Sequence, residues 1–468
     1  MAEIWVNGMF VQRHAVGSYL GFDVALELDT GLVRVGAASR AEPNVIALRV
    51  DASFGSGHWY EGGGITRRVY LMHTPTRLRF VTDSVFAVTA KSKVVAGSTT
   101  AVVAPSAEVQ NGGPVGVGVM VRYVLFNRTT NAQVTASWTA ATAVPTGEEA
   151  TLVESLVPLA VAAPQLWSIK DPALYTMVAE LYTVSGSSGK PVSPPVDTLN
   201  ITVGLREIDW HAAGGGFALN NEPVHLRGFS NHADFGGVGE AVPPRIDLFK
   251  ANALRSVGGN SFRCSHNPYP PHVYDILDEL GVLVWDENRD FSPGYVQDMG
   301  AMIRRDRNHP SVVIWSVCNE GECFVAGQGN ESARLFVAAA KQWDTTRPVS
   351  GNSWHMPHDP ITAANLSPYL DVEGFSHGSI SWAENVMKVN PGKTAVSSEC
   401  CSCEMQRGEN YLSIDGQNRQ VQYIADIHQA NCMTACLNKT YNSWRDHQVN
   451  PAGVIAGSLG VWTLFDYG

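Results

Sequence analysis

The sequence has few charged residues, no long basic run and no long uninterrupted apolar run. Charged side chains make up 16% of 468 residues, and the formal net charge is -11. This balance argues against a nucleic-acid partner. No apolar stretch reaches the ~18–20 residues of a membrane span, so no membrane partner is expected either. The opening MAEIWVNGMF shows no signal peptide. The sequence leaves the compartment open: a cytoplasmic protein is expected from the sequence as it stands, and a truncated N-terminus would allow a secreted or lysosomal one.

Cysteine is missing from the first half of the chain. Cys400, Cys401 and Cys403 lie close together in the sequence. However, no C-x-x-C motif occurs together with a second one, and adjacent cysteines chelate one ion poorly. We therefore expect no metal site and interpret the thiols as unpaired. The eight cysteines are Cys264, Cys318, Cys323, Cys400, Cys401, Cys403, Cys432 and Cys436.

The part of the chain up to residue 204 consists of short β-rich runs separated by turns. Examples are NVIALRVDA, LRFVTDSVFAV and LYTMVAELYTV. Such spacing, with Gly, Pro and Ser between the runs, is typical of antiparallel sandwiches. We place one sandwich at residues 1–85 and a second at residues 86–204.

From residue 205 strand-like runs alternate with helical ones. The helical runs are RIDLFKANALRSVG, PHVYDILDELG, SARLFVAAAKQW and QYIADIHQANCMTACLN. The strand candidates are VHLRGF, NSFRCSH, VLVWDEN, VVIWSVCNE, RPVSGNSW, YLDVEGFSH, KTAVSSE and VIAGSLGVW. The alternation favours a parallel β/α architecture, and residues 205–468 match the typical size of a (β/α)8, TIM-type barrel.

The two ends predict a chain truncated at both termini. It opens on IWVNGMFVQRH, which resembles the middle of a sandwich, and it stops at WTLFDYG just past the last strand candidate. We expect the barrel to lack its last helix.

Two glutamates end two of the strand-like runs. Glu320 follows HPSVVIWSVCN, and Glu399 follows KTAVSS. In barrels of this type the chemistry lies at the C-terminal ends of the strands. Many sugar-cleaving enzymes need two carboxyl groups facing each other across one bond. The alternative for each is an exposed glutamate at a strand end.

Several passages of the sequence resemble glycoside hydrolase family 2, the family of β-galactosidases, β-glucuronidases and β-mannosidases. GHWYEGGGITRRVYL resembles the family's W-Y-x-G-x-G-I-x-R signature, and GLREIDW with LNNEPVHLRGFSNHADF resembles the barrel entry. SFRCSHNPYPPHVYDILDELGVLVWDEN resembles the second and third barrel strands. RRDRNHPSVVIWSVCNE is the most specific match, and SSECC and GVWTLFDY complete the series in the expected order.

The resemblance implies a domain order and a mechanism. Residues 1–85 would be a partial sugar-binding jelly-roll β-sandwich, 86–204 an immunoglobulin-like β-sandwich and 205–468 the catalytic barrel. Glu399 matches the nucleophile and Glu320 the general acid/base, on strands seven and four. The family retains anomeric configuration, which implies carboxyl groups ~5–5.5 Å apart. No organic cofactor is needed, and the metal ligands of some members find no clear match.

Further residues are implied in sugar binding, each with an ordinary structural alternative. Asn319 would bond the sugar 2-hydroxyl, or cap a loop. His377 stands where many members carry a Tyr, in a D-V-x-G-x-N-Y context. The expected substrate-contacting residues are Asn319, His232, Asp234, His266, His377 and Trp462.

Three charged residues are expected to support the glutamates. Arg227 and Arg263 would reach inward and hold the carboxylates ionised, which is the charge-pairing route to a lowered pKa. Glu287 would lie behind the sugar contacts. The alternative for the two arginines is a salt bridge within the barrel layers.

The leading functional hypothesis is a retaining exo-β-glycosidase acting on a carbohydrate substrate. The WYEGGGI motif favours a β-galactosidase, with β-glucuronidase and β-mannosidase as alternatives. A hypothesis of another class is a truncated, inactive carbohydrate-binding remnant. The oligomeric state stays open, with a homo-oligomer as one alternative.

Overall fold

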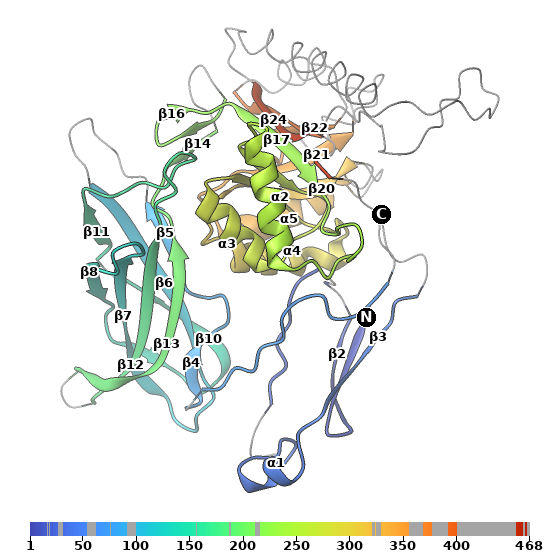
Figure 1. Cartoon of the computed structure of the whole chain (residues 1–468). Coiled ribbons are helices and arrows are strands. Elements are labelled where there is room, and N and C mark those ends of the chain that lie inside the picture. The colour runs from blue at the N-terminus through green and yellow to red at the C-terminus, as the bar shows by residue number, and fades with distance from the viewer. Residues whose placement is uncertain are drawn as a thin grey trace, which may run out of the picture.

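The protein has an N-terminal sheet, a β-sandwich and a barrel, and Figure 1 shows the sandwich beside the barrel with the N-terminal sheet below. The computed structural model describes residues 1–15, 17, 19–26, 31–53, 62–74, 76–90, 100–155, 157–186, 189–210, 216–320, 323, 329–354, 368–376, 392–399, 455–461 and 464–465. None of the helices in these ranges is long and apolar enough to cross a membrane.

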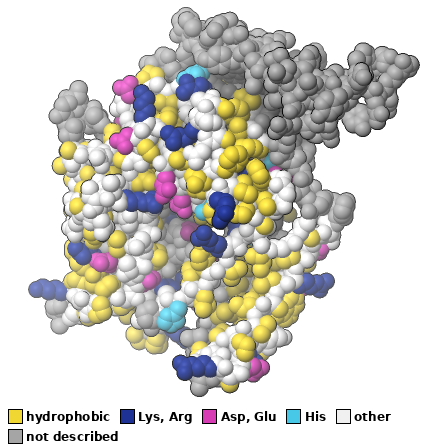
Figure 2. Space-filling view, viewed as in Figure 1, with side chains coloured by type: hydrophobic (Ala, Val, Ile, Leu, Met, Phe, Trp, Pro, Cys, Tyr) yellow, Lys and Arg dark blue, Asp and Glu magenta, His cyan; other side chains and the backbone are white. Residues whose placement is uncertain are grey.

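The N-terminal sheet is antiparallel and has three strands in the order β2-β1-β3: β1 (Ala2–Val6), β2 (Met9–His14) and β3 (Ile46–Val50). The hairpin between β1 and β2 turns at Asn7 and Gly8, whose φ angles are 51° and 83°. Asn-Gly is favoured there because both central residues of such a turn need positive φ. The short helix α1 (Ala37–Ala41) precedes β3. Every residue of β3 is exposed, and apolar side chains lie at the surface in the lower part of Figure 2.

The second sandwich consists of two antiparallel sheets that pack on one apolar core. Residues of β6 alternate between buried and half-buried, as expected for a strand with one face on a core. Its first sheet has β4 (Leu78–Phe80), β5 (Phe86–Ala90), β6 (Thr100–Asn111), β10 (Gly147–Glu154) and β11 (Leu159–Ala162). Its second has β7 (Val117–Asn127), β8 (Gln133–Trp138), β9 (Thr142–Val144), β12 (Tyr175–Val184) and β13 (Pro191–Val203).

The sandwich begins earlier in the chain than the boundary expected at residue 85. Strand β4 pairs with β6, so residues 78–80 belong to the second sandwich and not to the first. A small antiparallel sheet then leads into the barrel: β14 (Ile208–Asp209), β15 (Ala218–Leu219) and β16 (Glu222–Pro223).

Eight parallel strands close the barrel in chain order, which confirms the expected barrel sheet and all its strand candidates. Most residues of the strands whose side chains the structure describes are buried on both faces, as in parallel sheets covered by helices. The strands are β17 (Leu226–Asn231), β18 (Ser261–Cys264), β19 (Leu283–Glu287), β20 (Val312–Asn319), β21 (Val349–Trp354), β22 (Val372–Ser376), β23 (Thr394–Glu399) and β24 (Ile455–Val461).

Helices cover the near side of the barrel in Figure 1. Proline at the first helical position begins α2 and α3, and Gly281 ends α3 in the left-handed conformation. The sequence reading missed α4, and the last predicted helical run lies outside the described residues. The helices are α2 (Pro244–Ser256), α3 (Pro271–Leu280), the short 3-10 helix η2 (Pro293–Tyr295), α4 (Val296–Asp306) and α5 (Gly329–Trp343).

The segment RNHP before β20 joins the barrel to the sandwich. The Arg307 guanidinium donates to the carbonyl of Ser84 at 3.2 Å, and Asn308 Nδ2 donates to the carbonyl of Val85 at 2.8 Å. From the other side, Arg206 donates to the carbonyl of Val312 at 2.5 Å. This part of the most specific sequence match therefore serves domain docking rather than chemistry.

Candidate active site

Both glutamates lie at the C-terminal ends of barrel strands, as the sequence predicts. Glu320 directly follows β20, the fourth barrel strand, and Glu399 is the last residue of β23, the seventh. Glu320 has a φ of 44°, so the chain turns sharply where the strand stops. Glu399 is buried at 6% exposure, whereas Glu320 is half-buried.

One arginine connects the two strand ends. Arg263 lies on β18 and is fully buried. Its Nη1 donates to Glu399 Oε2 at 2.9 Å, and its Nη2 donates to Asn319 Oδ1 at 2.7 Å. Burial disfavours the charged guanidinium, but Glu287 and Glu399 together outweigh burial and raise the pKa of Arg263. Its positive charge is therefore permanent.

Two further residues lie close to both glutamates. Ser376 ends β22, where its hydroxyl donates to Glu320 Oε1 at 2.5 Å while its backbone pairs in register with Glu399. Neighbouring strands are about 4.8 Å apart. Burial and then Arg263 lower the pKa of His266 well below its usual value, and the carboxylates of Glu399 and Glu320 oppose this. Both carboxylates thus act on one buried ring.

Glu287 holds the other side of Arg263. It is fully buried and accepts from Arg263 Nη2 at 3.0 Å and from Trp285 Nε1 at 2.9 Å, and its Oε1 lies 2.8 Å from His266 Nδ1. Burial raises the pKa of Glu287, and Arg263 and the indole of Trp285 oppose that rise. His266 Nδ1 also lies 3.0 Å from Arg263 Nη2, so the tautomer decides whether this nitrogen donates to Glu287 or accepts from Arg263. Either contact fixes the orientation of the ring.

The Asn319 side chain is oriented by its own hydrogen bonds. Its Oδ1 accepts from Arg263 and also from Asn352 Nδ2 at 2.6 Å. Asn352 on β21 in turn accepts from the hydroxyl of Ser398. With its oxygen occupied twice, Asn319 has its NH2 group left as a donor, and no acceptor for that group lies among the described residues. This orientation suits a donor to a sugar hydroxyl.

His232 and Asp234 follow β17 at the same end of the barrel. The His232 ring lies edge-on to that of His266, with 5.6 Å between centroids. Lys250 Nζ donates to the backbone carbonyls of His232 at 3.2 Å and Asp234 at 2.7 Å. Burial, reinforced by neighbouring positive groups, lowers the pKa of His232 to about 2, so this ring is neutral.

Arg227 does not belong to this group of residues. Its side chain is exposed, and its Nε donates to the carbonyl of Gly258 at 3.0 Å. The expectation that it would hold the glutamates ionised therefore does not fit its position, because it lies near the start of β17 rather than at its end. His377 and Trp462 lie outside the described residues.

The sequence interpretation missed three contributors to the site. Ser376 and Asn352 carry no motif, although Ser376 stands directly before His377 at a strand end. The third is a disulfide between Cys318 and Cys323, on either side of Glu320. The prediction of unpaired thiols is wrong for this pair, and the C-x4-C spacing around Asn319 and Glu320 was the available signal. Cys264 is free and buried.

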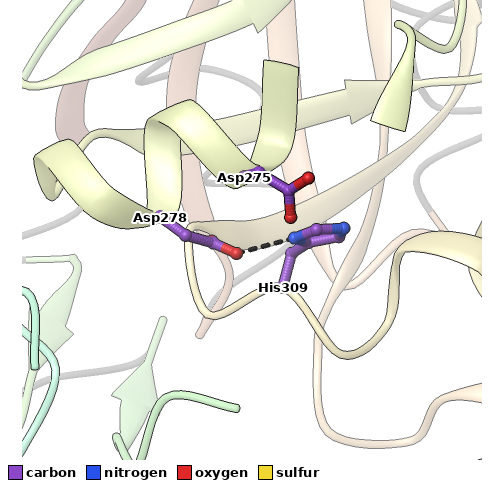
Figure 3. Close-up of side chains that lie close together, drawn as sticks. All are labelled: Asp275, Asp278 and His309. Atoms are coloured by element: carbon purple, nitrogen blue, oxygen red, sulfur yellow. Dashed lines mark hydrogen bonds and ion pairs between the residues drawn. The ribbon is translucent and has the colours of Figure 1, made fainter. Parts of the chain in front are cut away.

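A cluster of potential metal ligands, Asp275, Asp278 and His309, lies at the opposite end of the barrel (Figure 3). Asp278 accepts from His309 Nδ1 at 2.6 Å and from the backbone N–H of Ser311 at 2.9 Å. Burial alone would lower the pKa of His309, but Asp278 and two further carboxylates raise it to about 9. Asp278 and His309 thus form an ion pair that joins α3 to the segment before β20.

Comparison with known proteins identifies both the sandwich and the barrel. The model of the glycosyl hydrolases family 2 TIM barrel domain matches residues 212–301 and 287–388, and the model of glycosyl hydrolases family 2 matches residues 84–192. A putative beta-glucuronidase of Formosa agariphila is 30% identical over 396 residues, which cover 81% of this chain and 33% of that protein. Beta-galactosidase BoGH2A of Bacteroides ovatus is 29% identical over 528 residues, covering 100% of this chain and 57% of that protein.

Solved structures agree with these matches. A glycosyl hydrolase family 2 member from Bacteroides cellulosilyticus superposes with a TM-score of 0.77 at 28% identity, covering 100% of this chain and 55% of that chain. This chain spans from a third to just over half of the length of the relatives it matches. The two family models together cover more than half of the chain and follow its order of sandwich and barrel. The chain belongs to glycosyl hydrolases family 2.

Proposed function

We propose that this chain is a retaining exo-β-glycosidase in which Glu399 is the nucleophile and Glu320 the general acid/base. The observation that carries the proposal is the pair of bridges between the two strand ends. Arg263 binds Glu399 and the residue before Glu320, and Ser376 binds Glu320 while pairing with Glu399. This arrangement suits the short carboxyl separation of a double displacement, ~5–5.5 Å.

The contacts assign a role to each group. The guanidinium of Arg263 donates to Glu399 Oε2 and orients this carboxylate, which attacks the anomeric carbon and forms a glycosyl-enzyme. Glu320 donates its proton to the leaving oxygen and then deprotonates the attacking water. The NH2 group of Asn319 donates to a sugar hydroxyl, an interaction that strengthens as charge develops. Neutral His232 and His266 supply uncharged contacts for the sugar.

The proposed specificity is for β-galactosides. The relative that covers the whole chain is named a beta-galactosidase, which favours this choice. Beta-glucuronidase is the alternative, favoured by the name of the relative from Formosa agariphila. The substrate itself is therefore the first variable in the test.

The test is turnover of nitrophenyl β-galactoside, β-glucuronide and β-mannoside by the wild-type chain and by Glu399→Ala and Glu320→Ala. We expect one glycoside to be hydrolysed and both variants to lose activity, the acid–base loss being ~10²–10⁴-fold. Azide replaces the missing nucleophile in Glu399→Ala and gives a glycosyl azide of inverted configuration. In Glu320→Ala azide attacks the glycosyl-enzyme and gives the retained configuration.

The control is Glu222→Gln, because Glu222 is an exposed carboxylate on β16, away from the barrel mouth. Its activity is expected to equal that of the wild type. A folded wild-type chain that turns over none of the three glycosides would refute the proposal and favour a carbohydrate-binding remnant.

A further inference from the structure

The Cys318–Cys323 disulfide closes a short covalent ring around the candidate acid/base. Cys318 is the penultimate residue of β20, and the bond joins it to a residue five positions later. The ring therefore contains both Asn319 and Glu320. Both sulfur-bearing residues are buried, at 0% and 1% exposure, so the ring is anchored in the barrel wall.

Strand β21 supports the ring along one side. Cys323 Sγ lies 3.3 Å from the carbonyl oxygen of Asn352, whose side chain donates to Asn319 within the ring. Gly351 leaves room for the bond, since a Cβ at that position would lie 3.1 Å from Cys318 Sγ. The disulfide and the Asn319 hydrogen bonds thus hold the same few residues against one strand.

The conformation of Glu320 explains why such a constraint is useful. Its φ of 44° is left-handed, which costs a non-glycine residue roughly 1–2 kcal/mol. Backbone conformations of this kind persist only when the surroundings over-determine them. The covalent ring supplies that constraint directly at the residue whose carboxyl must meet the leaving oxygen.

We propose that this disulfide is a redox-sensitive positioning device for Glu320, and that the enzyme is fully active only while the bond is intact. The inference rests on the proposed function. A dithiol reductant breaks the S–S bond and transfers two electrons and two protons, giving two cysteine thiols while the reductant becomes a disulfide. Oxidised glutathione reverses the step and is itself reduced to the thiol.

The first experiment tests the bond itself. Trypsin releases residues 308–334, a peptide that contains Cys318 and Cys323 and no other cysteine. The native chain is denatured without reductant, alkylated and digested. The expected peptide is unalkylated and two hydrogens lighter than its reduced form. A peptide with two alkylated thiols would overturn the inference.

The second experiment measures turnover of nitrophenyl and dinitrophenyl glycosides in the oxidised chain, the reduced chain and the Cys318→Ala/Cys323→Ala variant. Misplacement of a catalytic group by 1 Å costs about 10²-fold, so kcat/KM for the nitrophenyl substrate is expected to fall by that order. Dinitrophenolate leaves without protonation, so kcat/KM for that substrate is expected to change little. Oxidised glutathione restores the reduced wild type, whereas the double variant responds to neither reagent.

The matched control is Cys264→Ala, which removes a buried thiol elsewhere in the barrel and is expected to retain the response to reductant. Full activity in a chain whose thiols are shown to be free would overturn the inference. Equal losses with both leaving groups would also overturn it, because the bond would then support the barrel in general and not the acid. A chain with the bond intact and no turnover of any glycoside would refute the proposed function as well.

Discussion

Replacing Arg263 by methionine is the most informative single change in the barrel. The arginine is fully buried and lies between two buried carboxylates. It binds Glu287 through Nε at 3.2 Å and Nη2 at 3.0 Å, and it binds Glu399 through Nη1 at 2.9 Å. Methionine fills part of the volume but leaves both carboxylates without their cation.

Breaking a buried pair by removing one partner typically costs about 3–5 kcal/mol, because the other charge stays buried. We expect the free energy of unfolding of Arg263→Met to fall by that amount at neutral pH. Burial already raises the pKa of Glu287, and the variant removes the guanidinium that opposes this rise. A carboxyl with a folded pKa above its unfolded value favours folding at low pH, and this advantage is lost as the pH rises through the folded value. The loss of unfolding free energy in Arg263→Met is therefore expected to be smaller in mildly acidic buffer than at neutral pH.

The assay is denaturant unfolding followed by tryptophan fluorescence, in a double-mutant cycle with Glu287→Gln. Neutralising Glu287 is expected to recover part of the lost stability in the Arg263→Met background. A coupling energy below about 0.5 kcal/mol would refute the reasoning, since groups in one ion-pair network couple more strongly. Arg227→Met is the matched control, because this arginine is exposed and its loss is expected to cost less than about 0.5 kcal/mol.

Three further changes test separate parts of the structure. Ser376→Ala removes the hydroxyl that donates to Glu320. Because a typical hydrogen bond contributes about 0.5–1.5 kcal/mol, kcat/KM is expected to fall about 2- to 10-fold, with recovery in Ser376→Thr. His309→Gln removes a group whose pKa Asp278 raises to about 9 against the effect of burial. The stability that this pair contributes, on the order of 3 kcal/mol, is fully present below pH ~6.5 and is lost as the pH rises through 9, so the alkaline loss of stability is expected to disappear in the variant. Gly204→Ala places a Cβ 2.5 Å from the ring of Pro310, the last residue of the RNHP segment, and is expected to lower the free energy of unfolding by about 1–3 kcal/mol.

Each of these predictions has a contrary outcome. Wild-type kcat/KM in Ser376→Ala would mean that the hydroxyl does not orient the carboxyl. If the stability of His309→Gln fell at alkaline pH as that of the wild type does, the ion pair would not be the cause of this fall. A Gly204→Ala variant as stable as the wild type would show that the sandwich and barrel separate there without cost.

The barrel and its two glutamates could be predicted from the sequence because their signals are local. Continuous apolar runs of strand length alternate with helical runs, so strand order follows chain order in a parallel barrel. Polar residues that end such runs fall at one rim, and this placed Glu320 and Glu399 on the fourth and seventh strands. Neither inference required a contact between distant residues.

The partners of the glutamates were decided by tertiary structure. Arg227 and Arg263 are both arginines on barrel strands, yet one is exposed and the other is fully buried. Two properties determine this difference: how far along the strand each arginine lies, and the face of the sheet to which it points. The short runs LRGFSN and SFRC have no clear alternation of apolar and polar residues that would specify either property. The pairing of Ser376 with Glu399 likewise depends on the register between β22 and β23.

The sequence by itself thus determined which carboxyl groups end which strands, because hydrophobic period and chain order are properties of neighbouring residues. Only the closed barrel determined that one guanidinium serves both strand ends, that RNHP docks a sandwich, and that two cysteines enclose Glu320. These contacts join residues far apart in the chain or on opposite sides of a turn. They form only when packing fixes strand depth, register and backbone direction.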